Sequence, residues 1–277
     1  MLQGCGTYGI VSRSGFASPM PTSPTFQPAR GAERMLRRGG LKVLRRIGVT
    51  HQVTRAQGAW FRIDMADLVD SCIARDALWE GPQVNILAAS ARASGATLFL
   101  DIGANIGFYS IMFATHALAP RIIAFEPDPG NFARLAANLR INGLQTRVDA
   151  VQLALGDADS EVVLHEGASW NRGESTIAVP EQTPQLVAHR VRQARFDDLH
   201  ALKGETVIVK IDVEGYEFHT LRGMERTLRD NACLLQIEHY GTEFERLKAA
   251  MEGYGYRFLR TIAIDHYFSN DSRLSAG

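Results

Sequence analysis

The stretch Thr-Leu-Phe-Leu-Asp-Ile-Gly-Ala-Asn-Ile-Gly, residues 97–107, decides the fold of this chain. Its apolar first half predicts a short buried strand that ends on Asp101, and its glycines allow a sharp turn into a helix expected over 106–117. The start of such a helix offers unpaired N–H groups to a ligand. A strand-to-helix turn that binds nothing is the alternative interpretation.

The spacing within this turn bears on the kind of ligand. It reads Gly-x-Asn-x-Gly and lacks the Gly-x-Gly-x-x-Gly of turns that seat a dinucleotide pyrophosphate. Asp101 at the entrance repels a pyrophosphate and attracts an ammonium group. The turn therefore favours a zwitterionic nucleoside such as S-adenosylmethionine.

Outward from this turn, apolar runs alternate with helical patterns. The pattern predicts strands over 121–126, 148–155, 161–165, 206–212, 234–239, 257–259 and 263–268. It predicts helices from Asp128-Pro129 to Asn142-Gly143, over 217–229 and over 242–252. This alternation predicts an α/β fold with right-handed βαβ units and a mostly parallel sheet covered by helices on both faces. Ligands of such sheets bind beyond the carboxyl ends of the strands.

Two acids at predicted strand ends are candidates for cofactor binding. Glu126 lies 25 residues after Asp101, where a carboxylate can accept both hydroxyls of a ribose. Asp157 follows the third strand of the pattern, where it can accept a hydrogen bond from an adenine amine. The alternatives are an exposed strand-end acid and a surface Gly-Asp turn.

Candidates for acid–base chemistry follow the next two predicted strands. Asp212 ends an apolar strand and can serve as a base or an orienting group, with Glu214 in support. His239 is a competing proton acceptor, and a structural role for it and a helix-capping role for the two acids are the alternatives. Acids at Asp212 and Glu238 could attract magnesium, but the ligand set is incomplete and no metal is predicted.

Charge is distributed unevenly along the chain. The 30 basic side chains balance 30 acidic ones, yet residues 1–50 hold eight Lys/Arg and one acid, Glu33. The remainder carries 22 bases and 29 acids, so a basic leader precedes an acidic domain. The acidic domain argues against nucleic acid as a partner. No apolar run is long enough to span a bilayer, and three scattered cysteines outside any CxxC spacing predict neither a zinc site nor a disulfide framework. We expect a reducing, cytoplasmic location.

The chain is expected to divide into three parts. Residues 1–34 form a leader, interpreted as disordered or as the product of an upstream start codon, with an organellar transit peptide as the alternative. Residues 35–94 form a mixed segment packed on the core, with helices expected over 34–47, 65–73 and 82–93 and a strand over 59–63. The first of these helices is basic and amphipathic, and we expect it to pack on the main domain with a solvated basic face rather than to contact an acidic surface or membrane. Residues 95–270 form the cofactor-binding domain.

Five segments together resemble the FkbM-type methyltransferases, a branch of the class I S-adenosylmethionine-dependent methyltransferases. They are DIGANIGFYS (101–110), AFEPDPGNFARLAANLRING (124–143), ALGD (154–157), FDDL (196–199) and VKIDVEGYEFHTLRGM (209–224). The resemblance covers roughly residues 75–260. It departs from the family pattern at Phe196, where the family often has Thr-Leu, and the leader has no counterpart.

The resemblance implies a Rossmann-like, seven-stranded, mostly parallel sheet with an antiparallel last strand, and O-methylation of a hydroxyl on a small-molecule or glycan acceptor. With it, we expect Asp101 and Asn105 to hold the methionine portion of S-adenosylmethionine and Gly103 and Gly107 to admit it. Glu126 would hold the ribose, Asp157 the adenine, and Asp212 the acceptor, with residues 167–176 as an acceptor pocket or lid. The rival functions are a noncatalytic nucleoside-binding or scaffold protein and an NAD-dependent oxidoreductase. The oligomeric state stays open.

Overall fold

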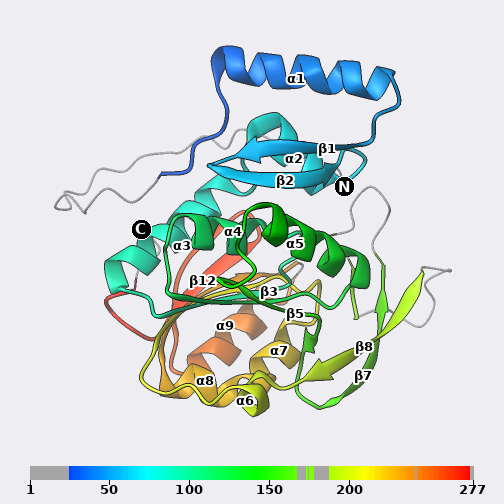
Figure 1. Cartoon of the computed structure of the whole chain (residues 1–277). Helices are drawn as coiled ribbons and strands as arrows, with labels where there is room; N and C mark the ends of the chain where they lie inside the picture. Colours follow the sequence, from blue (N-terminus) through cyan, green and yellow to red (C-terminus); the bar gives the residue numbers. More distant parts are fainter. Residues whose placement is uncertain (1–24, 167–172, 174, 178–186, 241, 275–277) are drawn as a thin grey trace.

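A central sheet of seven strands organises the computed structural model, which describes residues 25–166, 173, 175–177, 187–240 and 242–274 (Figure 1). Its order is β11-β12-β10-β9-β3-β4-β5. All neighbours pair in parallel except β12, which runs antiparallel to β10 and β11. The strands are β3 (Leu98–Ile102), β4 (Arg121–Phe125), β5 (Asp149–Val151), β9 (Thr206–Ile211), β10 (Ala232–Glu238), β11 (Arg257–Ile262) and β12 (Asp265–Ser269). The predicted α/β class, with its antiparallel last strand, is confirmed.

Helices cover both faces of this sheet, as Figure 1 shows. One face packs on α3 (Gly81–Ser94), α4 (Phe108–Thr115) and α5 (Pro129–Ile141). The other packs on α6 (Phe196–Leu199), α7 (Glu217–Gly223), α8 (Glu225–Asp230) and α9 (Phe244–Gly253). Alternate residues of each strand enter the two cores, so Phe99 contacts the first set of helices while Leu98 and Leu100 contact the second. Burial on both faces explains the continuous apolar runs of the sequence.

A three-stranded sheet stands beside the central one, in the order β6-β8-β7. Its strands are β6 (Ala154–Leu155), β7 (Ser160–His165) and β8 (Ala188–Ala194). The single strand predicted over 148–155 is therefore wrong, because the chain leaves the central sheet after Val151 and pairs next with β8. The helix predicted over 217–229 is two helices that meet at Met224. A Cβ on Gly223 would lie 1.9 Å from the carbonyl oxygen of Gly156, so this glycine allows the end of α7 to touch the turn after β6.

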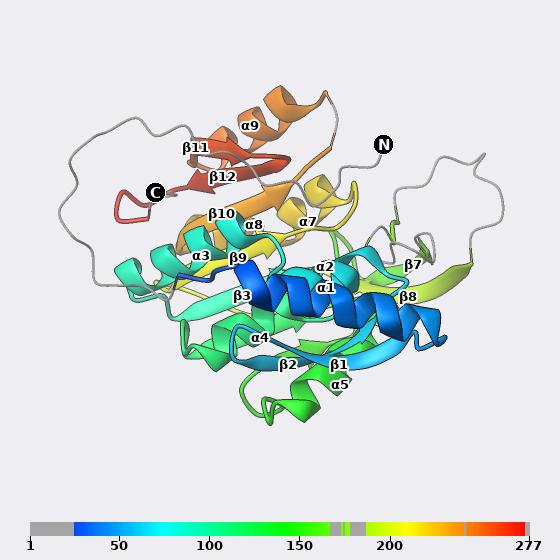
Figure 2. The same cartoon turned by 90° about the horizontal axis from the view of Figure 1, so that it is seen from above.

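The N-terminal segment forms α1 (Gly31–Arg46), a hairpin of β1 (His51–Ala56) and β2 (Ala59–Asp64), and α2 (Leu68–Asp76). Phe61 of the hairpin is fully buried in the core of the α3–α5 face. The side chains of Asn138 on α5 and of Asn142, its C-cap residue, accept hydrogen bonds from the free edge of β2, at 2.7 Å from Arg62 N and 2.8 Å from Trp60 N. Figure 2 shows α1 on the outside of the molecule, over α2.

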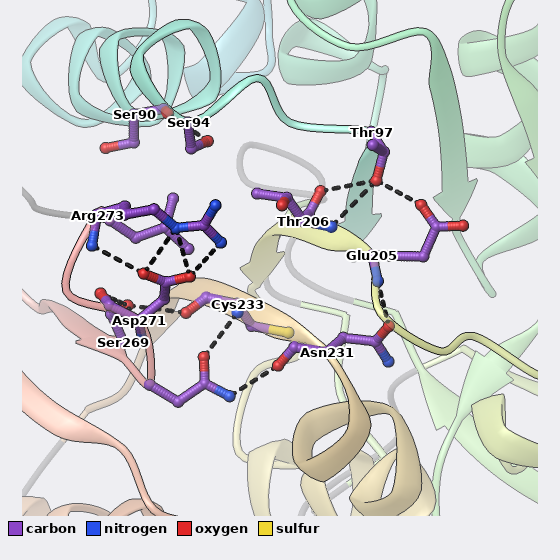
Figure 3. Close-up of polar contacts among 12 residues, drawn as sticks. Ser90, Ser94, Thr97, Glu205, Thr206, Asn231, Cys233, Ser269, Asp271 and Arg273 are labelled. Carbon is purple, nitrogen blue, oxygen red and sulfur yellow. Dashed lines mark hydrogen bonds and ion pairs between the residues drawn. The ribbon is translucent and has the colours of Figure 1, made fainter.

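Polar side chains join the loops at the amino ends of β3, β9 and β10 (Figure 3). The Thr97 hydroxyl donates to Glu205 Oε2 at 2.5 Å and accepts from Thr206 N at 3.1 Å. Ser269, at the end of antiparallel β12, donates to the carbonyl of Cys233 at 2.9 Å.

In the part of the chain that the structure describes, no helix is long and apolar enough to cross a bilayer.

An ion pair between α2 and α5 joins the N-terminal segment to the domain. The carboxylate of Asp70 is fully buried and bonded to the Arg134 guanidinium, and it also accepts from Asp64 N at 2.5 Å. We expect Arg134→Met to lower the free energy of unfolding by about 3 kcal/mol or more, because it leaves a buried acid without its partner. Urea denaturation measures the loss. Arg140→Met, on the exposed side of the same helix, is the control, and equal losses in both variants would contradict the prediction.

Candidate functional site

A narrow cavity of about 50 Å³ lies at the carboxyl ends of β3, β4 and β9. Side chains and backbone from all three strand ends and from β6 line it, together with residues 173, 175 and 177. Its lining includes four of the predicted site residues: Gly103, Asn105, Glu126 and Asp212. Ligand binding beyond the carboxyl ends of parallel strands is the rule for this architecture.

The loop after β3 touches the loop after β9 through backbone atoms. Gly103 has φ +80°, and a Cβ placed on it would lie 1.7 Å from the carbonyl oxygen of Asp212. The two loops are also joined by Asp212 N, which donates to Ile102 O at 3.0 Å. Gly103 is thus required by the close approach of the two loops.

Gly107 has a different environment from Gly103. Its φ is +86°, and a Cβ there would lie 2.3 Å from Leu135 Cδ1 on α5. It is absent from the residues that line the cavity. The described geometry gives Gly107 a role in packing α4 against α5, and the ligand-admitting role expected from the sequence stays a prediction.

Glu126 lies between the turn and the start of α5. Its Oε2 accepts from Asn105 N at 2.7 Å and its Oε1 from Asp128 N at 2.9 Å. Burial raises the pKa of Glu126 to about 8, against the lowering effect of these two hydrogen bonds. Each carboxylate oxygen has two acceptor positions, so Glu126 can still accept from a ribose. The left-handed φ of +51° at Asn105 aims its N–H at Glu126.

Asp101 is 1% exposed and does not line the cavity. Its Oδ2 accepts from Ser110 N at 3.0 Å and from the Ser110 hydroxyl at 2.6 Å, which fixes the first turn of α4 on β3. Its Oδ1 is buried with no hydrogen-bond partner among the described residues. Burial raises the pKa of this carboxyl, and nearby Lys210 opposes that effect.

Lys210 is a residue of the site to which the sequence analysis assigned no role. It is 4% exposed on β9, and its Nζ lies 2.8 Å from Asp212 Oδ2 and 5.1 Å from the centre of the Tyr109 ring. Burial lowers the pKa of Lys210, but the surrounding carboxylates, Asp212 first, outweigh it and raise the pKa well above its usual value. A lysine inside the otherwise apolar run Thr-Val-Ile-Val-Lys-Ile was the available signal.

Further acids surround Lys210 from three elements. Glu80, just before α3, accepts from the Tyr109 hydroxyl at 2.6 Å and has a left-handed φ of +44°. Glu238 on β10 stands opposite Asp265 on β12, which accepts from Gln83 and Gln236 at 3.0 and 2.8 Å. Burial, together with the negative charge of the neighbouring acids, raises the pKa of Glu80 and of Glu238.

The carboxyl groups near Lys210 outnumber its single positive charge. Oxygens of Asp212, Glu214 and Glu238 lie within 4.8 Å of one another, a spacing at which acids can share a cation. We refer to Glu80, Asp212, Glu214, Glu238 and Asp265 as the acidic crevice. A further positive charge beside these groups would favour their ionised form.

His239 is separated from the acidic crevice by the pleat of β10. It lies on the side of Ile237, where its Nδ1 is 3.1 Å from Glu217 Oε2 and its ring meets Phe218 edge to face at 5.8 Å. Glu238 faces the other side, with Gln236. The structure thus brings Asp212 and Glu214 together and places His239 against α7.

The N-cap residue of α7 is Tyr216, and no side chain of the described residues caps this helix, so the capping role considered for Asp212 and Glu214 is not seen. Glu217 Oε1 accepts from Gly215 N at 2.7 Å, in the turn just before the helix. Glu214 has φ +50°, and its carbonyl accepts from the Thr176 hydroxyl at 2.5 Å.

Asp157 points away from the cavity. Its carboxylate lies 3.1 Å from His219 Nδ1 and 2.7 Å from Arg222 Nη2, and it is not among the lining residues. Partial burial raises its pKa, but hydrogen bonds from His219 and Arg222 outweigh this and lower it. The cavity is instead lined here by Leu153, Ala154 and Leu155. Residues 167–172 and 174, part of the expected lid, lie outside the described residues.

Because the pKa of Glu126 is raised in the folded chain, the contribution of this residue to the free energy of unfolding depends on pH. Between about pH 5 and 8 the unfolded chain has released this proton while the folded chain retains it, so a rise in pH favours unfolding. We expect Glu126→Gln to gain stability relative to wild type over this range, by roughly 1 kcal/mol or more. Urea denaturation at pH 5, 6, 7 and 8 measures the difference. The control is Glu245→Gln at an exposed position, whose gain in stability should not grow with pH. The prediction is contradicted when the stability difference between Glu126→Gln and wild type does not depend on pH.

Comparison with known proteins identifies the family of this chain. The model of the Methyltransferase FkbM domain matches residues 101–258. Methyltransferase 1 of Beauveria bassiana is 26% identical in an alignment of 183 residues that covers 58% of this chain and 72% of that protein. Methyltransferase sdnD of Sordaria araneosa is 28% identical in an alignment of 178 residues that covers 60% of this chain and 64% of that protein.

Two further similarities are of the same kind. Hexuronic acid methyltransferase AglP of Haloferax volcanii is 26% identical over 155 residues, 52% of this chain and 56% of that protein. The crystal structure of methyltransferase FkbM from Methylobacillus flagellatus KT matches with a TM-score of 0.44 and 18% identity, over 63% of this chain and 43% of that one. The family match spans more than half of the residues, and the chain belongs to the FkbM methyltransferase family.

Proposed function

We propose that this chain transfers the methyl group of S-adenosylmethionine to a hydroxyl oxygen of a small molecule or sugar. The observation that carries the proposal is the ion pair between buried Lys210 and Asp212, which lines a cavity together with Gly103, Asn105 and Glu126. Membership of a methyltransferase family supports the reaction class. The relative named for hexuronic acid supports a sugar as the acceptor.

The residues around the cavity fit S-adenosylmethionine in charge and in hydrogen bonding. Glu126 can accept from the ribose hydroxyls, and the acidic crevice offers negative charge to a sulfonium and an ammonium group. The unpartnered Oδ1 of Asp101 is a further acceptor near the turn. The cavity is much smaller than the roughly 300 Å³ or more that ligand sites of this size occupy, so binding requires its walls, including Gly173, Ser175 and Ile177, to move apart.

In the proposed mechanism the bound cofactor supplies a methyl group on a sulfonium, whose C–S bond breaks as the bond to the acceptor oxygen forms. The chain's task is then to hold that oxygen in line and to take its proton. Lys210 occupies Oδ2 of Asp212 and fixes the carboxylate, which leaves Oδ1 to accept the hydroxyl proton. In this scheme Lys210 is a positioning residue and Asp212 the catalytic one.

Replacing Asp212 tests this assignment. We expect Asp212→Asn to lower kcat about 100-fold with a small change in S-adenosylmethionine affinity, because the amide keeps the shape but cannot take the proton. His239→Gln is the matched control, and its kcat should stay near wild type since His239 contacts Glu217 on α7.

The measurement follows labelled methyl transfer from S-adenosylmethionine to a panel of hexuronic acids, other sugars and small-molecule extracts. Label found only on protein or RNA would contradict the proposed acceptor class. S-adenosylmethionine binding with no transfer to any acceptor would favour the noncatalytic alternative. A larger loss of kcat in His239→Gln than in Asp212→Asn would reverse the two roles.

The cofactor half of the proposal is tested by binding alone. At pH 9.5, above the raised pKa of Glu126, we expect Glu126→Gln to weaken S-adenosylmethionine binding about 10-fold or more, because a charged acceptor is lost from the ribose. Asp157→Asn should weaken it less, because that carboxylate is held by His219 and Arg222. Isothermal titration calorimetry measures both. The reverse order would place the adenine on Asp157, and tight NAD binding without S-adenosylmethionine binding would contradict the proposal altogether.

A further inference from the structure

The helix α1 lies on the outside of the molecule and has no buried residue (Figure 2). Arginines hold it on the body from one side. Arg34 pairs with Asp76 at 2.8 Å, Arg37 donates to Arg55 O at 2.8 Å, and Arg45 donates to Met65 O at 2.8 Å. Leu41 and Leu44, on the same side, pack partly against the core. This side accounts for how α1 is attached.

The other side of α1 exposes apolar side chains. Leu36, Val43 and Ile47 are 73%, 59% and 68% exposed, and we call them the apolar stripe. At 100° per residue they fall within about 40° of one another around the helix axis. Scattered single apolar residues are common on protein surfaces, whereas an aligned row on one helix face indicates a surface that becomes covered.

A row of positive charge lies about 120° around the helix axis from the apolar stripe. Arg38, Lys42 and Arg46 follow one another at four-residue spacing, and we call them the basic row. All three are exposed, and within the described residues none of them makes a hydrogen bond or ion pair. The one acid of the helix, Glu33, lies away from this row and is bonded to Arg37 at 2.9 Å. Helix α1 is thus apolar along one exposed line and cationic along a second, about a third of a turn away.

From this arrangement we propose that the outer face of α1 binds an anionic lipid bilayer. Apolar side chains in such a helix enter the boundary between headgroups and acyl chains, while Lys and Arg reach the lipid phosphates with their long stems. Helix α1 lies outermost on its side of the body, so a planar surface can meet it along its length (Figures 1 and 2).

A second copy of the chain is a poorer partner for this face. A symmetric contact through the apolar stripe would set two copies of α1 against each other, each with six cations and one acid, and like charges oppose such a contact. An anionic bilayer has the opposite charge over its whole surface. Charge complementarity therefore favours an anionic bilayer over a second copy of the chain as the partner of this face.

Flotation of the full chain with vesicles tests the proposal. We expect binding to vesicles of phosphatidylcholine and phosphatidylserine at 7:3, weaker binding at high salt, and little binding to phosphatidylcholine alone. Replacing the basic row by glutamine should lower the partition coefficient roughly 100-fold, since each cation contributes about fivefold. Leu36→Gln with Val43→Gln and Ile47→Gln should lower it by a similar factor or more.

Matched controls show whether vesicle binding depends on this face of α1 or on exposed charge and apolar side chains anywhere on the molecule. Glutamine at exposed Arg140, Arg147 and Lys203, or at exposed Ile141, Val163 and Leu199, should leave vesicle binding unchanged. Circular dichroism of every variant confirms that it is folded. Absence of binding to anionic vesicles, equal losses in the controls, or a dimer in light scattering that the apolar-stripe variant abolishes would overturn the proposal.

Discussion

The contact between Gly103 and the carbonyl of Asp212 is the constraint on which the rest of the site depends. It sets the loop after β3 directly against the loop after β9, at a distance that excludes any side chain at position 103. Both loops leave the carboxyl ends of neighbouring parallel strands, and Asp212 N bonded to Ile102 O continues the sheet for one more residue. This contact bounds one side of the cavity. The backbone of Asp212 is therefore held in place by its own contacts with Ile102 and Gly103, whatever its side chain binds.

Lys210 compensates only part of the negative charge that the acidic crevice would carry with all of its carboxyl groups ionised. Lys210 approaches Asp212 from the same strand, while Glu80 and Glu238 come from other elements, and burial raises the pKa of both acids. Removing buried acids from water is unfavourable unless a positive charge compensates. A cationic cofactor would supply that charge, which is the physical link between the proposed reaction and the composition of this site.

The sequence predicted the central sheet well because its strands are buried on both faces and read as continuous apolar runs. It missed β1 and β8, whose alternating polar residues, such as Arg190 and Arg192, are exposed on one side. It also joined Val148–Leu155 into one strand, since the move from one sheet to another has no signal in an apolar run.

The site was predictable where a residue type and a strand end coincide. Asn105, Glu126 and Asp212 line the cavity as that rule implies. The direction of a side chain is harder to foresee, because His239 and Glu238 are neighbours in sequence yet face opposite sides of β10. Glu80 lies outside every strand-end motif of the sequence. Only the packing of α3, which sets Glu80 against the Tyr109 hydroxyl, assigns it to the acidic crevice.

Glu80 and Gln83 precede the first strand of the family domain, yet both contribute to the crevice, through Tyr109 and Asp265. The side chains around Lys210 therefore come from separate stretches of the chain, some of them outside the residues that match the family. A fragment limited to residues 101–258 would lose Leu98–Leu100 of β3 and all of β12, and with them Glu80, Gln83 and Asp265.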